Sequence, residues 1–172
     1  MGTLRIPDDM FVAGTLAARQ MTIPDGSVTD DAVAASAGIA ATKLEHQHAL
    51  VYRQADGTDV VSETMPLWTC RGSSATAVAI EAVCLTAPAG GDKQVTVDLK
   101  KCNQASPTPA SILASTITID STKSDAEVIT GTIDTADLSD GDTLVIEVTA
   151  SGSTGTQAQG LVVTVTVRED AD

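Results

Sequence analysis

The stretch Gln94–Lys101, QVTVDLKK, alternates apolar and polar side chains from one end to the other. Successive side chains of an extended strand point to opposite faces, so this period of two predicts a strand with one buried and one solvated face. We expect Val95, Val97 and Leu99 to point into a core. Such a half-buried strand is typical of an antiparallel sheet.

The same period of two continues through most of residues 60–167, interrupted by loops rich in Gly, Pro and Asp such as APAGGD at 87–92. Further strands are expected at residues 60–66, 67–71, 75–86, 111–120, 127–133, 143–149 and 161–167. One face of the strand at 75–86 is expected to carry Val78, Ile80, Ala82 and Cys84. No crossover helix is available, so the pattern predicts an antiparallel sandwich or jelly roll.

Residues 1–44 have a different character, because small side chains dominate and apolar ones are sparse. Residues 1–22 are expected to form an extended arm with a strand near residues 10–16. Residues 23–44, IPDGSVTDDAVAASAGIAATKL, predict two short helical turns, the first with Thr29 as its cap. This segment cannot bury much surface alone, so we expect identical copies to pack against one another through it.

A polar connection is expected at residues 45–58, with a strand near residues 49–54 and an Asp-Gly turn after it. The predicted protein is therefore mainly β and has two parts. Residues 1–58 form an N-terminal arm and a trimerisation and docking segment with short helical turns, and residues 59–172 form an acidic, jelly-roll-like antiparallel β-sandwich.

The chain carries a formal net charge of −13, and residues 59–172 contribute −10 of it. Binding to nucleic acid requires a basic face that neutralises phosphates, so we expect no nucleic-acid partner. No apolar run is long enough to span a membrane. The three cysteines, Cys70, Cys84 and Cys102, are expected to be free thiols in the core, with a Cys70–Cys84 disulfide as the alternative.

Candidate chemistry is sparse. His46 and His48 in EHQH would share one face of a strand, and three copies around a threefold axis would present six ring nitrogens to a metal ion, although solvent-exposed polar residues are the alternative interpretation. The acidic loop at residues 134–142 lacks the spacing of an EF-hand, so a solvated turn is expected there. Lys100 and Lys101 are expected at a solvated strand end, with an interface contact as the alternative.

No pattern of nucleophile, base or paired carboxylates points to catalysis, and only three aromatic side chains are present: Phe11, Tyr52 and Trp68. Trp68 is expected to anchor the core. We therefore expect neither an enzyme nor a bound cofactor.

A family resemblance runs through residues 10–60. Gly14-Thr15-Leu16 is followed by the Pro24-x-Gly26-Ser27-Val28 turn, the Ala-rich turns ending in Lys43-Leu44, and the polar strand at residues 51–54. This order resembles the trimerising N-terminal part of tailed-phage virion proteins, namely head-decoration (cement) proteins, head fibres and some tail fibres.

The resemblance implies a homotrimeric structural protein that decorates and stabilises the outer surface of a phage capsid after synthesis in the host cytoplasm. The alternative is a fibre-type host-attachment or glycan-binding module of the virion. The expected partners are other copies of the chain and the major capsid protein. The trimer interface is expected at Val28, Val33, Ile39 and Leu44, and the capsid contact at Leu4, Ile6, Met10, Phe11 and Leu16.

Overall fold

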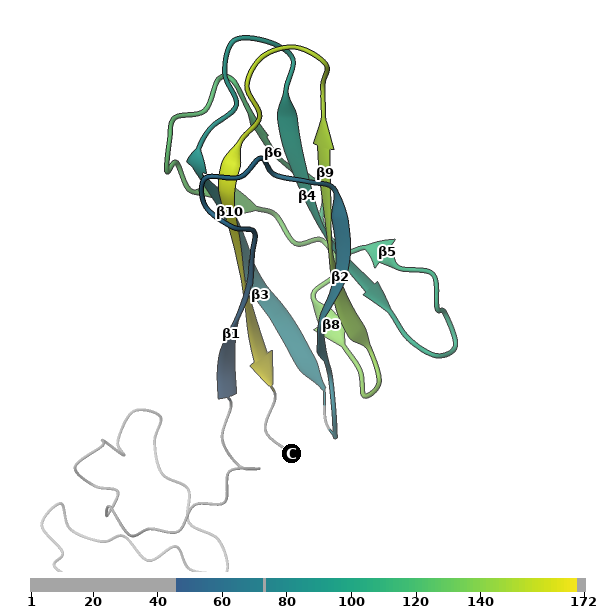
Figure 1. The fold of residues 1–172 in the computed structure, drawn as a ribbon. Coiled ribbons are helices and arrows are strands. Elements are labelled where there is room, and N and C mark those ends of the chain that lie inside the picture. The colour runs from purple at the N-terminus through teal and green to yellow at the C-terminus, as the bar shows by residue number, and fades with distance from the viewer. Residues whose placement is uncertain (1–45, 73, 170–172) are drawn as a thin grey trace, which may run out of the picture. The chain divides into compact units, whose positions relative to one another are not determined.

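A computed structural model describes residues 46–72 and 74–169, which fold into two facing antiparallel sheets (Figure 1). The first sheet has the order β1-β10-β3-β7, with β8 paired to the far end of β3. Its strands are β1 (His46–Arg53), β10 (Gln159–Glu169), β3 (Ala75–Thr86), β7 (Ile129–Gly131) and β8 (Asp137–Leu138).

The second sheet has the order β2-β9-β4-β5, with β6 also paired to β4. Its strands are β2 (Glu63–Thr69), β9 (Thr143–Ser151), β4 (Gln94–Cys102), β5 (Ala110–Ser111) and β6 (Ile117–Asp120). The longer strands therefore lie in the orders β1-β10-β3-β7 and β2-β9-β4-β6, and the chain passes repeatedly from one sheet to the other. This is the jelly-roll arrangement of a two-sheet sandwich.

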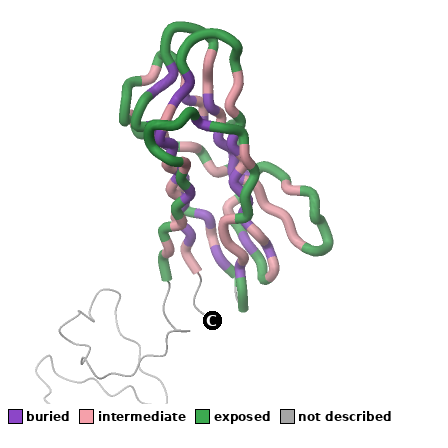
Figure 2. Tube along the Cα trace, in the orientation of Figure 1, coloured by how far each residue is buried: buried purple, intermediate pink, exposed green. Residues whose placement is uncertain are grey.

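The core lies between the sheets and is made of Val, Ile, Leu and Ala, so the buried positions follow the centres of the long strands (Figure 2). Val95, Val97 and Leu99 of β4 are all 0% exposed, which confirms the inward face predicted from QVTVDLKK. Leu161, Val163, Val165 and Val167 of β10 face them with the same exposure, so the period of two identified both central strands.

Three details of the predicted strands are wrong. The segment 111–120 is not continuous, because Ala114 N–H donates to Thr132 O and the chain crosses toward the other sheet between β5 and β6. The two strands expected at 60–66 and 67–71 are the single strand β2, Glu63–Thr69, which has a register shift between Pro66 and Trp68. Val78 is exposed, because a register shift in β3 turns Ala77 inward instead.

The strand β1 belongs to the sandwich. It pairs with β10 along its whole length, from His46↔Glu169 to Arg53↔Val162, and its Tyr52 is only 4% exposed. The compact unit that contains the described strands also begins before residue 59. The boundary expected between residues 58 and 59 thus falls after a strand that the sandwich already uses.

The sandwich has two distinct ends (Figure 1). We call the end that holds His46, Glu169 and the connections 70–74, 103–109 and 139–142 the stem end. The opposite end, called the loop end, holds the connections 54–62, 87–93, 121–128 and 152–158. His46, the first described residue, lies at the stem end, so the loop end is the part of the sandwich farthest from it.

Candidate functional surfaces

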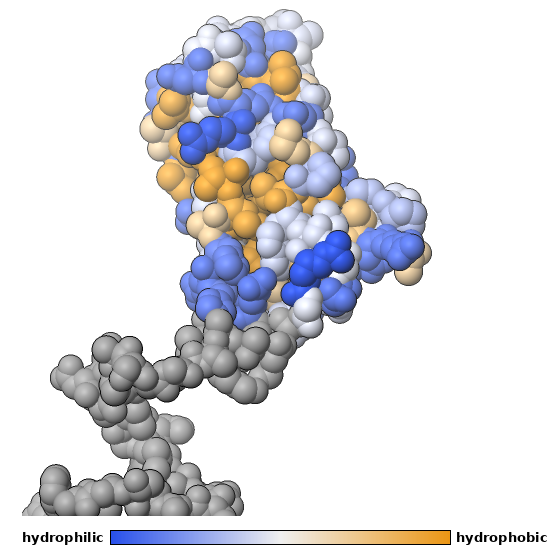
Figure 3. All heavy atoms as spheres, turned by 60° about the horizontal axis from the view of Figure 1, so that its bottom comes forward, coloured by the Kyte–Doolittle hydropathy of each residue, from blue (hydrophilic) through white to orange (hydrophobic). Residues whose placement is uncertain are grey.

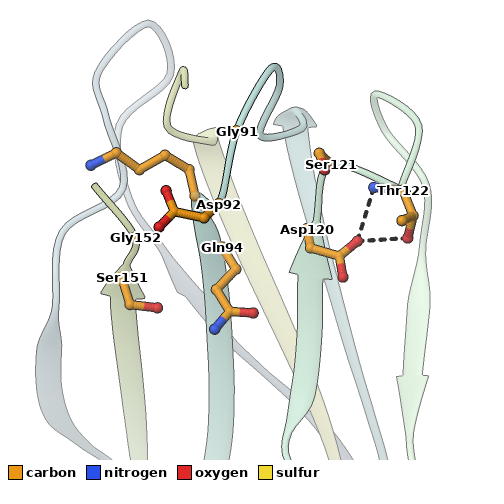
Figure 4. A pocket seen from close by; sticks show the side chains of 9 residues that line it. Gly91, Asp92, Gln94, Asp120, Ser121, Thr122, Ser151 and Gly152 are labelled. Atoms are coloured by element: carbon orange, nitrogen blue, oxygen red, sulfur yellow. Dashed lines mark hydrogen bonds between the residues drawn. The ribbon is translucent and has the colours of Figure 1, made fainter. Parts of the chain in front are cut away.

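The loop end contains a polar hollow of about 590 Å³ between the ends of three strands (Figure 4). Gln94, Ser151 and two acids, Asp92 and Asp120, lie around it. The two carboxylates point away from each other, Asp92 toward Gly152 and Asp120 toward its own turn. The hollow has no aromatic side chain in its lining, so it lacks the stacking surface that many ligand sites use.

The carboxylates of both acids in this hollow accept hydrogen bonds from residues of the loops. Asp92 accepts hydrogen bonds from the Thr154 N–H at 2.6 Å, the Thr154 hydroxyl at 2.8 Å and the Ser153 N–H at 2.9 Å, and these bonds hold the pKa of Asp92 well below its ordinary value. Asp120 accepts bonds from the hydroxyl and N–H of Thr122, which lower its pKa. The two acids therefore fix turns.

At the stem end, Asp142 is 3% exposed and ties three segments together. It accepts bonds from Asn103 Nδ2 at 2.8 Å and from the Ser139 N–H at 2.9 Å, and Lys101 Nζ lies 3.5 Å away. Burial raises the pKa of Asp142, but these hydrogen bonds and the lysine charge outweigh it and hold the pKa below its ordinary value. The contacts of the buried Asp142 side chain thus fix the conformation of the acidic loop.

Lys100 and Lys101 are ion-paired, so the expectation of a solvated strand end is wrong. Lys100 Nζ lies 2.6 Å from Glu147 Oε1 and 3.8 Å from Asp98 Oδ2, on the outer face of the second sheet. Lys101 Nζ donates to the Asp137 carbonyl at 3.0 Å and pairs with Asp142. Carboxylates on β4, on β9 and in the connection before β9 therefore pair with the two lysines.

His46 and His48 lie on one face of β1, as predicted. Their ring centroids are 6.5 Å apart with an interplanar angle of 19°, and His48 Nε2 lies 3.0 Å from Glu169 Oε2 on β10. In the described part of the chain, no three His, Cys, Asp or Glu side chains are grouped as metal ligands. A site shared by several copies stays a prediction.

A hydrogen-bond network, called the polar tie below, joins the end of β1 to β2 and to the connection between them. Tyr52 Oη donates to Glu63 Oε2 at 2.6 Å and accepts from Gln54 Nε2 at 2.6 Å. The Gln54 side chain also bonds both backbone groups of Val61, at 2.9 Å each. Burial, followed by the Glu63 hydrogen bond, raises the pKa of Tyr52 to about 12. Nothing in the sequence pattern indicated this network, because its members come together only in the fold.

The cysteines form no disulfide. Cys70 and Cys84 are buried as expected, and burial raises the pKa of the Cys84 thiol to about 11, whereas Cys102 is only half-buried. Trp68 is half-buried and packs against the core from β2. These side chains therefore belong to the packing of the sandwich.

Apolar atoms gather on the face that carries β1 and β2 (Figure 3). The large apolar side chains that are exposed in the described region are Val51, Val61, Met65, Val78, Leu85 and Val128. Val51, Val61 and Met65 come from β1, β2 and the connection between them, so this side of the sandwich is the most apolar candidate for a contact surface.

The residues predicted for the trimer interface and for the capsid contact lie outside the described residues. This holds for Val28, Val33, Ile39 and Leu44 and equally for Leu4, Ile6, Met10, Phe11 and Leu16. Both sets stay predictions. Across residues 46–72 and 74–169, no helix has the length and apolar character needed to cross a membrane.

No protein-family model and no curated protein matches this chain. A solved structure of infectious bursal disease virus, Gx strain, is similar with a TM-score of 0.31 and 14% identity over 72% of this chain and 36% of the viral chain. The chain thus corresponds to about a third of that viral protein. At these values the similarity assigns no residue of this chain a role.

Proposed function

We propose that this chain is a virion structural protein, a homotrimeric decoration protein on the outside of a tailed-phage capsid. In this proposal residues 1–44 hold the trimer and contact the major capsid protein, and the sandwich faces solvent. The role is mechanical, with no catalysis and no cofactor. Each trimer bridges neighbouring capsid subunits, and many weak contacts add up to a more stable shell.

The observation that carries the proposal is the position of the attachment point. His46 pairs with Glu169 at the stem end, so the segment that resembles phage trimerisation sequences enters the sandwich opposite its free loops. A module tethered at one end presents its other end outward. The charge supports this orientation, because residues 46–169 hold fifteen acidic and seven basic side chains, which favour a hydrated, mutually repelling surface.

The fold is compatible with a virion structural protein and also with other classes of protein. Jelly rolls serve as viral structural domains and also as lectin and cupin domains, and a fold by itself does not identify a function. The alternative is a fibre-type attachment module that binds a host glycan. The loop-end hollow is its natural site, but its acids are engaged in turns and its lining lacks aromatic side chains.

The position and copy number of the protein on purified virus particles distinguish the two functions. A decoration protein is expected in lattice-like copy number over the head, whereas a fibre occurs at one vertex or on the tail. Substituting Phe11→Asp should weaken attachment of the full chain to undecorated capsids by about 2–4 kcal/mol per subunit, because it removes apolar burial and adds an unpaired charge. Val128→Asp at the loop end is the control. Equal attachment of both variants, or binding to a glycan array without head decoration, would favour the alternative.

A further inference from the structure

The two long edge strands of the sandwich, β1 and β2, are built differently. An open edge strand offers unpaired N–H and C=O groups to other chains, and proteins usually protect such edges with proline, bulges, charges or short length. In the described region β2 carries Pro66 and a register shift beside it, and the other two edges are covered by the short strands β5 to β8. β1 has neither device over its eight residues.

The hydrogen-bonding phase of β1 identifies the groups that face outward. The N–H of Gln54 donates to Leu161 O at 2.8 Å, one position beyond the Arg53↔Val162 pair. Bonding direction alternates along an antiparallel strand, so the backbone groups of Gln47, Ala49, Val51 and Arg53 point away from β10. Among the described residues, no strand pairs with this edge of β1, so the N–H and C=O groups of these four alternate residues are available to another chain.

The surface beside this edge differs in charge from the rest of the sandwich. The register aligns outward-facing residues of β1, β10 and β3 in four cross-strand rows: Gln47–Arg168–Thr76, Ala49–Thr166–Ala79, Val51–Thr164–Glu81 and Arg53–Val162–Val83. These rows include two basic side chains and one acidic side chain, and Asp137 of β8 continues the first row beside Thr76. The surface is therefore balanced in charge, in a domain with fifteen acids and seven bases. Val51 is 46% exposed in the middle of this surface.

We infer that the β1 edge and these four rows, together called the β1 face, form the contact between copies of this chain. Two acidic sandwiches repel each other through most surfaces, and the β1 face is where that repulsion is smallest. Its balanced charge also lets it approach the acidic flank of a neighbour, in a head-to-tail contact of the kind that closes a ring. The inference rests on the homotrimer in the proposed function and assigns part of its interface to the sandwich.

A matched pair of substitutions in the full chain tests the inference. Val51→Glu and Val128→Glu add the same charge at exposed valines, 46% and 57% exposed, on the β1 face and at the loop end. We expect Val51→Glu to raise the dissociation constant of the trimer about tenfold or more, measured by analytical ultracentrifugation, while Val128→Glu leaves it unchanged. Circular dichroism checks that both variants fold. Equal dissociation constants for the two variants overturn the inference, while the proposed homotrimer still stands.

Amide hydrogen exchange gives an independent readout on the unmodified protein. The Val51 N–H should become protected as protein concentration rises through the dissociation constant, because a neighbouring copy covers it. Exchange at the solvent rate in a protein that is trimeric overturns the inference but not the proposed function. A chain that stays monomeric at every concentration contradicts both. If Val51→Glu raises the dissociation constant of the trimer but the protein is absent from virions, the inference stands and the proposed function is wrong.

Discussion

The two long edges of the sandwich lie side by side, yet one is protected and the other is open. On β2, Pro66 removes an N–H group and the adjoining register shift interrupts regular pairing. On β1, the eight-residue ladder is uninterrupted and no other described strand pairs with the outer edge, where Arg53 is the one Lys, Arg, Asp or Glu side chain. Since both strands cover the same core, folding does not require this difference. The inferred contact between copies of the chain would explain the difference.

The largest expected effect comes from breaking the tie between the two edges. Tyr52→Ala removes a 4% exposed ring and the donor to Glu63, and should lower the free energy of unfolding by about 3–5 kcal/mol. Tyr52→Phe keeps the ring and should cost about 1 kcal/mol. Urea unfolding monitored by circular dichroism measures both. A similar loss in the two variants would mean that the hydroxyl network, and not ring burial, joins β1 to the core.

High pH should weaken the same tie without mutation. The pKa of Tyr52 is raised from 10.0 to about 12, so the folded protein keeps its proton at a pH where the unfolded chain loses it. The contribution to stability is complete below pH 10 and is lost as pH rises toward 12, by about 2 kcal/mol. Tyr52 is the single tyrosine, so ultraviolet absorbance of tyrosinate reports its titration directly. Titration near pH 10 in the folded state would contradict the buried network.

Replacing Pro66 should make the edge of β2 more similar to the edge of β1. Pro66→Thr restores an N–H on an exposed position, so we expect the free energy of unfolding to change by less than about 1 kcal/mol. Self-association should increase, because β2 then offers a more regular edge. Light scattering over a concentration series measures this, with Thr64→Ser on the same strand as the control. Unchanged association would assign the protection of β2 to its register shift alone.

The smallest expected effect is at the base of β1. His48→Gln removes the 3.0 Å contact with Glu169, in which the two side chains are 43% and 31% exposed. Pairs this exposed contribute at most about 1 kcal/mol, so thermal unfolding should shift only slightly. A large loss of stability would show that this contact, rather than the backbone ladder, holds the start of β1 against β10.

The sandwich illustrates how far a period of two can predict a fold. It located β3, β4, β9 and β10 within two residues and placed Val95, Val97 and Leu99 in the core. It failed at Val78 and at residues 111–120, where a bulge and a crossing between sheets change the side-chain phase. Irregularities of this kind are set by partner strands distant in the sequence, so a local pattern carries no signal for them.

The place of β1 in the sandwich could not be predicted for a related reason. Residues 45–58 are expected from the sequence to be a polar connection with a strand near residues 49–54, and so to belong to the arm. The place of β1 in the sheet depends on eight backbone pairs with β10 and on burial of one ring, Tyr52. A fragment that begins near Asp59 therefore lacks β1 and uncovers β10.

The sequence by itself determined the fold class, the direction of the central side chains and the acidic surface, because alternation and composition act locally. Only the tertiary structure decided which strands are neighbours, that Lys100 and Lys101 are paired, and that Tyr52, Gln54 and Glu63 form one network. It also decided that β1 is an open edge beside a charge-poor face. An edge is defined by the strand that is missing next to it, so it follows from the order of strands in the sheet and from no single segment of the chain.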